Sequence, residues 1–189
     1  MFPADVHHSS FVMLALLAAF ALIHSGGAAL RPRAESLVGA RAWRLIFAGA
    51  SIPSAVLLIG YFLLHRYDGV RLWNLQGLPG MVEIVFAMTV ISFFFLYPAT
   101  YNLLEIPAVQ KPEVRLYTTG IIRISRHPQA IGQILWCFSH GIWIGSSFMM
   151  VTCAGLIAHH IFAIWHGDRR LKNKFGNQFE ELKESTSVI

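Results

Sequence analysis

Apolar residues fall in five long blocks along the chain, and polar residues gather in the connections between them. A bilayer core is about 30 Å thick and a helix rises about 1.5 Å per residue, so roughly 20 apolar residues cross it. The blocks have about this length, and none shows the strict alternation of a half-buried strand. The pattern predicts five transmembrane helices, at residues 9–30, 44–65, 80–100, 130–147 and 148–165.

Two segments outside the blocks also carry a pattern. Residues 101–126 form the longest connection, and Pro107, Pro112 and Tyr117 indicate that it lies along the membrane interface. In the C-terminal tail, apolar residues recur at steps of four, four and three, which is typical of an amphipathic surface helix: Leu171, Phe175, Phe179 and Leu182. No repeat or low-complexity linker interrupts residues 1–189. We therefore expect a single all-α domain, a polytopic membrane helical bundle.

Composition and charge agree with this interpretation and set its orientation. Of the 189 residues, 55% are hydrophobic and 13% charged, which excludes an ordinary soluble domain. With five spans, 13 of the 15 Lys and Arg lie on the side of the C-terminus, and only Arg66 and Arg71 lie on the other. The positive-inside rule therefore places the C-terminus in the cytoplasm or the stroma. The positive net charge suits anionic lipid headgroups, and nucleic acid is not an expected partner.

Four histidines lie well inside the blocks, where an ionisable side chain is costly and marks a candidate functional site. They are His24, His140, His159 and His160. Counted from the basic face, His24 lies roughly 9 Å deep and His140 roughly 15 Å deep, and the other two lie at a similar level. For a single residue, a polar contact between packed helices is the simpler interpretation. Several imidazoles at one depth exceed what packing requires.

Polar groups share one face of the fourth block. The residues follow at steps of four, three, four and three: Gln133, Cys137, His140, Ile144 and Ser147. In the first block, His24 is followed by small residues at positions 25–29, which let another helix or a flat ring approach the backbone. The two blocks together predict a site built from imidazoles and one thiol.

Four of the other histidines have simpler explanations. His7 and His8 lie near the N-terminus, where a solvated or interfacial position is expected. His127 precedes Pro128, a residue that suits the first turn of a helix. His65 ends the second block and is expected to contact lipid headgroups.

Neutral imidazoles in a dry site suit a transition metal. Imidazole binds iron, copper and zinc, and paired histidines from separate helices commonly hold a haem in a membrane bundle. A zinc site would usually show carboxylates or closely spaced ligands, but the sequence has no HExxH motif. It also lacks a P-loop, a GxGxxG cradle and a Ser/His/Asp constellation. These features favour haem over the other metals.

Three segments resemble the 15-cis-zeta-carotene isomerases of plants, algae and cyanobacteria. They are HSGGAALRPRAE from residue 24, GIIRISRHPQAIGQILWCFSHGIWIG from residue 120, and GLIAHHIFAIWHGDRRLKNKFGNQFEELKESTSVI from residue 155. These enzymes belong to a wider group of NnrU membrane proteins that share the RHPQ element. The resemblance implies a haem b protein that converts 9,15,9'-tricis-zeta-carotene to the 9,9'-dicis isomer, with ferrous iron in the active form.

The resemblance also implies roles for single residues. By motif, the axial ligands of the haem iron fall on His24 and His140, and Cys137 is an alternative ligand when the redox state changes. The substrate is then a carotenoid dissolved in the bilayer of a plastid envelope, a thylakoid or a cyanobacterial membrane. Similar plant chains continue beyond TSVI with a proline and another apolar segment, so this chain is expected to lack a sixth span.

Two other functions fit part of the same residues. RHPQAIG and the later KFG also resemble elements of integral-membrane methyltransferases that use S-adenosylmethionine. However, Ala130 stands where their first motif has a tyrosine, and Asp168 is followed by Arg169 and Arg170, so the acidic pair that precedes their second motif is missing. The second alternative is a membrane haem protein that only senses or carries electrons.

Overall fold

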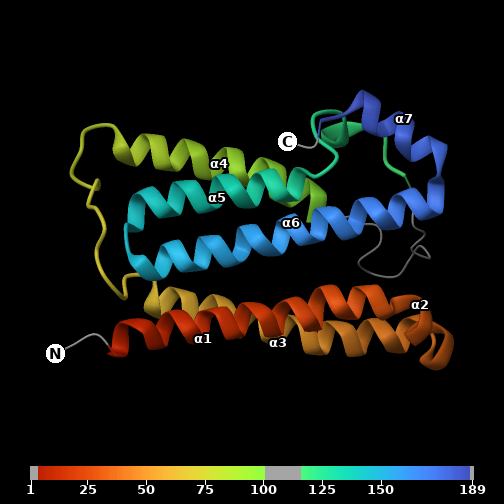
Figure 1. The fold of residues 1–189 in the computed structure, drawn as a ribbon, viewed down its shortest axis with the longest axis horizontal. Coiled ribbons are helices and arrows are strands. Elements are labelled where there is room, and N and C mark those ends of the chain that lie inside the picture. Colours follow the sequence, from red (N-terminus) through yellow and green to blue (C-terminus); the bar gives the residue numbers. More distant parts are fainter. Residues whose placement is uncertain (1–3, 101–115, 188–189) are drawn as a thin grey trace. The chain divides into compact units, whose positions relative to one another are not determined.

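The computed structural model describes residues 4–100 and 116–187, and every regular element within these ranges is helical (Figure 1). An apolar chain favours helices because a helix makes its backbone hydrogen bonds within the segment. In chain order the elements are α1 (Ala4–Ala21), the π-helical turn η1 (Leu22–Gly26), α2 (Gly27–Val38), α3 (Ala40–His65), α4 (Met81–Thr100), the 3₁₀ turn η2 (Gly120–Arg123), α5 (Pro128–Ile144), α6 (Ser147–Phe175) and α7 (Asn177–Ser185).

The chain divides into two compact units. Unit 1 comprises Met1–Asn74 and Ile144–Leu156, and unit 2 comprises Leu75–Trp143 and Ile157–Ile189. Unit 1 therefore holds α1, α2, α3 and the first turns of α6. Unit 2 holds α4, α5, α7 and the remainder of α6.

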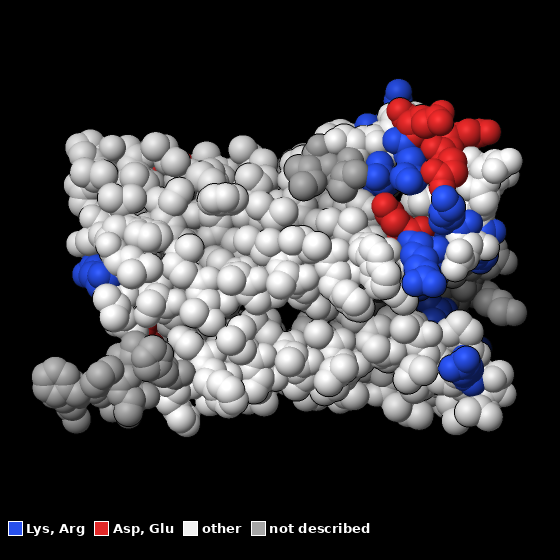
Figure 2. All heavy atoms as spheres, viewed as in Figure 1, with Lys and Arg blue, Asp and Glu red and all other residues white. Residues whose placement is uncertain are grey.

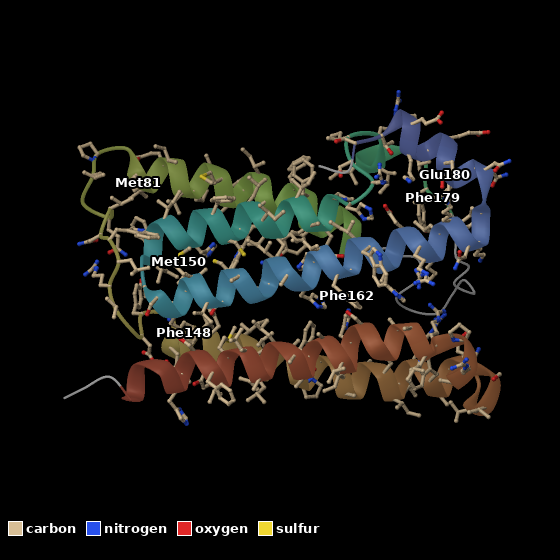
Figure 3. All side chains as sticks on the ribbon, viewed as in Figure 1. Met81, Phe148, Met150, Phe162, Phe179 and Glu180 are labelled. Atoms are coloured by element: carbon tan, nitrogen blue, oxygen red, sulfur yellow. The ribbon has the colours of Figure 1, made fainter. Side chains whose placement is uncertain are left out.

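The interior of unit 1 is filled by the start of α6. Helices α1 and α3 lie side by side (Figure 1), and Phe148 and Met149 of α6 are completely buried in this unit. Phe148 is labelled in Figure 3, and its ring lies 6.4 Å from the rings of both Tyr61 and Phe62 on α3. Many large apolar side chains of α1 and α3 stay exposed, as is usual for a surface that faces lipid.

A two-residue turn at Gly145 and Ser146 joins α5 to α6 and binds the segment after α3. The Gly145 carbonyl accepts a hydrogen bond from the Leu72 amide at 2.7 Å. The Ser146 hydroxyl donates to the Arg66 carbonyl at 2.7 Å. Gly145 has a φ of +63° and lies so close to Trp73 that an added side chain would collide with it. Glycine is therefore required at this corner.

In unit 2, α4 and α5 run antiparallel and approach closely through small residues (Figure 1). The Ser92 hydroxyl donates to the Gly132 carbonyl at 2.8 Å, and the Thr89 hydroxyl bonds with Ser139 at 3.2 Å. A Cβ on Gly132 would lie 2.8 Å from the Ser92 carbonyl oxygen and 3.0 Å from the Leu96 amide nitrogen. The absence of a side chain on Gly132 thus allows the two backbones to meet.

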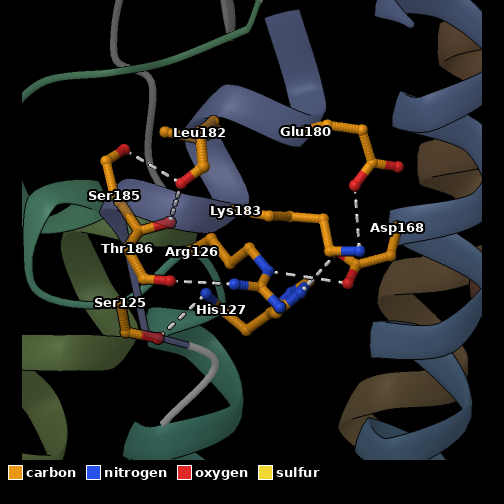
Figure 4. A network of polar contacts seen from close by, with 9 residues as sticks. All are labelled: Ser125, Arg126, His127, Asp168, Glu180, Leu182, Lys183, Ser185 and Thr186. Carbon is orange, nitrogen blue, oxygen red and sulfur yellow. Dashed lines mark hydrogen bonds and ion pairs between the residues drawn. The ribbon is translucent and has the colours of Figure 1, made fainter. Parts of the chain in front are cut away.

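A polar network joins the start of α5 to α6 and to the C-terminal residues (Figure 4). His127 Nε2 lies 2.7 Å from Asp168 Oδ1, and Arg126 Nε lies 3.5 Å from Oδ2 of the same carboxylate. Arg126 also donates to the carbonyls of Thr186 and Ser187 at 3.0 and 3.1 Å. Burial lowers the pKa of the His127 imidazole, and Asp168 opposes this shift only in part. The Asp168 carboxylate thus lies between the His127 imidazole and the Arg126 guanidinium and holds both at the start of α5.

The short helix α7 packs on the same part of unit 2. Its Phe179, which Figure 3 labels, and its Leu182 are buried. The charged side chains of α7 and of the end of α6 gather at the surface there (Figure 2). Glu180 pairs with Lys172 at 2.7 Å and with Lys183 at 3.2 Å, and these contacts lower the pKa of its carboxyl. Exposed pairs of this kind contribute little to stability.

Within the described residues, three helical segments are long and apolar enough to cross a membrane, fewer than the five predicted: His8–Val38, Ala40–His65 and Ser147–Phe175. The all-helical fold is confirmed. Met81–Tyr97 of α4 is a shorter apolar stretch, and α5 has 17 residues. The predicted end of the fourth block was late by three residues, because α5 ends at Ile144, just before Gly145 with its positive φ.

Two connections differ from the expected ones. Residues 31–44 are helical except for Gly39, so the basic residues of the predicted first loop lie on α2 and α3. The tail is not one amphipathic helix, because Gly176, with a φ of +54°, separates α6 from α7. Leu171 and Phe175 therefore extend α6. The expected interfacial connection falls mostly on residues 101–115, which lie outside the described residues.

Gly132→Ala should destabilise the fold although alanine favours a helix over glycine by about 1 kcal/mol. The new Cβ would meet two backbone atoms of α4, and overpacking of this kind costs roughly 1–3 kcal/mol. Gly49→Ala on α3 is the matched control, since nothing lies within 4 Å of its Cβ. Thermal unfolding in detergent should show a lower Tm for Gly132→Ala alone. Equal Tm values would contradict the close α4–α5 contact.

Asp168→Asn should destabilise unit 2, because it removes the charge that balances a nearly buried Arg126. A hydrogen bond to a charged group contributes roughly 1.5–3 kcal/mol, and the partial exposure of Asp168 places the expected loss at the lower end. The control is Glu180→Gln, which alters only exposed ion pairs. Thermal unfolding of both variants in the same detergent should show a larger drop in Tm for Asp168→Asn. An equal drop for Glu180→Gln would contradict a larger contribution of Asp168 to stability.

Candidate functional site

The His140 side chain is oriented by the helix that carries it. Its Nδ1 lies 3.0 Å from the Trp136 carbonyl and 3.1 Å from the Ser139 hydroxyl, and its ring stacks on the Trp136 indole with centroids 4.0 Å apart. A carbonyl oxygen can only accept, so Nδ1 carries the proton. In the neutral imidazole, the lone pair then lies on Nε2. His140 thus has the protonation pattern of a metal ligand.

Cys137 lies one turn before His140 on α5 and is buried. The Gln133 amide donates to its Sγ at 3.7 Å, which would stabilise negative charge on the sulfur. Gln133 and Cys137 therefore lie on one face of α5, as their spacing predicts. Ile144 is buried at the end of this helix, whereas Ser147 is the first residue of α6.

His24 occupies the π-helical turn η1 in unit 1. Its Nδ1 lies 2.6 Å from the hydroxyl of Ser51, a buried residue of α3. Its ring stacks on Phe20 at 5.1 Å and lies 5.4 Å from the Phe47 ring, while the residue as a whole stays exposed. The extra residue of a π-helical turn redirects a side chain, and such turns are frequent at functional sites.

His159 and His160 are neighbours on α6, in unit 2. Their rings meet edge to face, with centroids 5.4 Å apart. Successive residues of a helix are rotated by about 100°, so the two imidazoles lie on different faces of α6.

Two other histidines bind carboxylates. His65 Nδ1 lies 2.7 Å from Asp68, and its ring stacks on Tyr61 at 4.2 Å. His127 precedes the first residue of α5, as its sequence position predicts, and also binds Asp168. His8 is exposed, and the side chain of His7 lies outside the described residues.

The candidate residues divide between the two units. His24 belongs to unit 1, and four others belong to unit 2: Cys137, His140, His159 and His160. The expectation that His24 faces a second histidine therefore stays a prediction. In the described part of the chain, no three His, Cys, Asp or Glu side chains converge as they would around an ion held by protein ligands alone. A haem iron needs only one or two, because the porphyrin supplies four nitrogens.

The donor set fits the axial ligands of a haem in its chemistry. A ligating histidine almost always hydrogen-bonds through its second ring nitrogen, which fixes the tautomer and the orientation of the ring. His140 meets this condition through the Trp136 carbonyl. For His24, the distance of 2.6 Å between Nδ1 and the Ser51 hydroxyl is that of a hydrogen bond. Each unit thus contains an imidazole suited to bind iron.

Sequence reasoning missed the partners of both imidazoles. Ser51 lies 27 residues from His24, and Trp136 acts through a carbonyl that any residue would supply. It also missed Asp168 as the carboxylate that binds the RHPQ element. One signal for Ser51 was available, since it is among the few polar residues in the middle of the second apolar block.

Known proteins are similar to nearly all of this chain. A protein of Arabidopsis thaliana named "15-cis-zeta-carotene isomerase, chloroplastic" is 54% identical over 177 residues, and one of Zea mays with the same name is 52% identical over 178 residues. Each match covers 94% of this chain, which spans about half the length of these relatives (48% and 49%). No solved structure matches. The profile of the NnrU protein family matches residues 12–189, and the chain therefore belongs to this family.

Proposed function

We propose that this chain forms the catalytic region of a haem-dependent 15-cis-zeta-carotene isomerase. The observation that carries the proposal is the identity of more than half of the residues, over 94% of the chain, with two proteins of that name. The reaction is the conversion of 9,15,9'-tricis-zeta-carotene to the 9,9'-dicis isomer, with haem b as the cofactor and ferrous iron in the active form. Only the bond at position 15 changes configuration.

The proposed substrate needs no acid or base catalyst, which agrees with a site in apolar helices, where ionisable residues are scarce. A carotene has no ionisable group, so a proton donor or acceptor has nothing to act on. When bound, a ferrous haem supplies a metal centre that can perturb the π system and lower the barrier to rotation about one double bond. The apolar helices would bind the hydrocarbon and keep water away from it.

His24 and His140 are the proposed axial ligands of the iron. Support for His140 comes from its Nδ1–Trp136 contact, which leaves the lone pair on Nε2, and support for His24 comes from its position in a π-helical turn. Cys137 is proposed as an alternative ligand of the ferric iron, because a thiolate favours the oxidised state. Its contact with Gln133 would stabilise that thiolate.

We further propose that α4 and α5 cross the membrane, giving five spans. A helix of 17 residues is about 26 Å long, close to the thickness of a bilayer core. Arg126 precedes α5 and binds the C-terminal carbonyl of Thr186 and the carboxylate of Asp168. The start of α5 therefore lies on the side of the tail, and its end at the Gly145 turn lies beside the segment after α3.

The proposed location is a plastid membrane, either the envelope or the thylakoid, with the C-terminus in the stroma. Both named relatives are chloroplastic, and the exposed apolar surface suits contact with lipid. The carotene would enter laterally from the bilayer.

Purified protein from haem-replete cells should contain about one haem b per chain, measured by its reduced and oxidised absorption spectra. His24→Ala and His140→Ala should each lose or severely perturb the haem and abolish isomerisation under dithionite, because residues 9–30 and 130–147 contain no Asp or Glu that could replace the imidazole. Cys137→Ala should keep ferrous activity and change mainly the ferric spectrum.

His159→Ala and His160→Ala are the matched controls, since they remove equally deep imidazoles from α6. Loss of haem in either one, with retention in His24→Ala, would show that the ligand pair is misassigned. A colourless protein, or one that binds S-adenosylmethionine, would refute haem-dependent isomerisation. A haem protein without carotene turnover would instead be a sensor or an electron carrier.

The orientation can be read from cysteine labelling of intact vesicles. Gly77→Cys lies between α3 and α4 at an exposed position with open space around its Cβ, and Asn177→Cys lies at the exposed start of α7. A membrane-impermeant reagent added to the outside of right-side-out vesicles, whose interior is the cytoplasmic or stromal side, should label position 77 and not position 177. The native thiols, Cys137 and Cys153, are buried and give little background. The reverse result would show that the orientation is wrong. Labelling of both positions would show that the number of spans is wrong.

A further inference from the structure

One nitrogen of the Arg44 guanidinium is buried without a hydrogen-bond partner. Arg44 lies in the second turn of α3 and is partly buried, and its Nη1 has no acceptor among the residues that the structure describes. The nearby Arg33 and Arg41 are exposed, so water can satisfy their nitrogens. A buried guanidinium nitrogen that has lost water without gaining an acceptor is costly. Arg44 is therefore a candidate binding residue for an acidic group.

The acidic residues of unit 1 do not provide this group. There are three of them: Asp5, Glu35 and Asp68. Glu35 forms an ion pair with Arg31, with 2.7 Å between its Oε1 and the arginine Nε. The other two lie near the opposite end of α3, where the Tyr61 hydroxyl donates to the Ser9 carbonyl of α1. Unit 1 itself therefore supplies no acid for Arg44.

Arg44 shares one face of α3 with the residues that contact His24. Ser51, Phe47 and Arg44 follow at steps of four and three, the spacing of one helical face. The Ser51 hydroxyl lies 2.6 Å from Nδ1 of His24, and the Phe47 ring lies 5.4 Å from the imidazole ring. Arg44 lies one turn beyond Phe47 and about 10 Å along the helix from Ser51. A ligand that binds at His24 and carries an acid at about this distance can therefore reach Arg44.

Haem b has this form, since its propionate side chains carry carboxylates at one edge of the porphyrin. The planar guanidinium of arginine binds a carboxylate through two parallel hydrogen bonds. Charge is costly in hydrocarbon, so the acidic edge of a bound haem should face the nearer membrane surface. Arg44 lies on that side of His24, because α3 begins at the basic face with Ala40.

We propose that Arg44 binds a propionate carboxylate of the haem and thereby sets which edge of the cofactor faces the membrane surface. The inference rests on the proposed function, in which His24 ligates the haem iron. A phospholipid headgroup is the other acid at a membrane surface. It would meet the exposed Arg33 and Arg41 first, and it does not explain a buried nitrogen in line with His24.

The first measurement compares haem b with its dimethyl ester, in which the carboxylates are neutral. Cofactor-free protein in detergent is titrated with each, and binding is followed by absorption. Arg44→Gln should bind haem b about 10-fold more weakly than wild type, the lower end of the effect of a hydrogen bond between charged groups. For the ester, wild type should be weakened by the same factor and Arg44→Gln should lose nothing further.

Two further variants serve as controls in the same titrations. Arg41→Gln removes the same charge from an exposed position of the same helix and should keep wild-type affinity for haem b. Arg44→Lys keeps the charge but lacks the planar pair of donors, so its affinity should lie between those of wild type and Arg44→Gln.

The second measurement is thermal unfolding with and without haem b. Without cofactor, Arg44→Gln should not lower the Tm, because the buried nitrogen has no partner to lose. With haem b, the rise in Tm should be smaller than in wild type, since the variant binds the cofactor more weakly. A purely structural role of Arg44 predicts the opposite, namely a lower Tm of the cofactor-free variant.

The possible failures can be told apart. If wild type and Arg44→Gln bind haem b equally well, Arg44 does not bind a propionate, and the proposed function is unaffected. A loss of affinity that persists with the ester would also overturn the inference, because Arg44 would then act without the carboxylate. Anionic phospholipid that is retained by wild type and lost from Arg44→Gln, at equal haem affinity, would assign Arg44 to a headgroup. A wild-type protein that bound no haem would refute the proposed function and this inference together.

Discussion

The structure depends on one constraint, which is that polar groups in an apolar chain must find partners within the protein. The helices satisfy their backbone groups internally, and the buried hydroxyls of Ser92 and Thr152 find carbonyls on a neighbouring helix or on their own. Side chains that cannot be satisfied in this way gather at the helix ends. The apolar middle and the polar ends of the fold both follow from this constraint.

The two ends of α5 show how the polar ends organise the fold. At its C-terminal end, the Gly145 turn leaves backbone groups that pair with the segment after α3, so the corner and that segment are fixed together in unit 1. At its N-terminal end, Arg126 and His127 bring an acid of α6 and the C-terminal carbonyls to one point in unit 2. Hydrogen bonds thus hold both ends of the short helix α5 in place.

The same need for partners gives the candidate imidazoles their chemistry. A histidine in hydrocarbon is expensive unless a ring nitrogen is hydrogen-bonded, and that bond also chooses the tautomer. For His140 the acceptor is a carbonyl, so the choice is fixed by chemistry alone. For His24 the partner is a hydroxyl that can donate or accept, so its surroundings decide. The contact that satisfies each buried ring nitrogen is therefore also the contact on which the tautomer of that imidazole depends.

The sequence by itself determined the helical class, the approximate positions of the apolar helices and the residues that could carry chemistry. These properties depend on local composition and on helical spacing, which is why Gln133 and Cys137 meet as their spacing predicts. Helix ends were harder, because a positive φ at Gly145 or Gly176 depends on what the turn contacts. Only the tertiary structure decided the pairing of His24 with Ser51 and of His127 with Asp168. Partners 27 and 41 residues apart leave no periodic signal, since their distance is set by how the helices pack and not by their order in the chain.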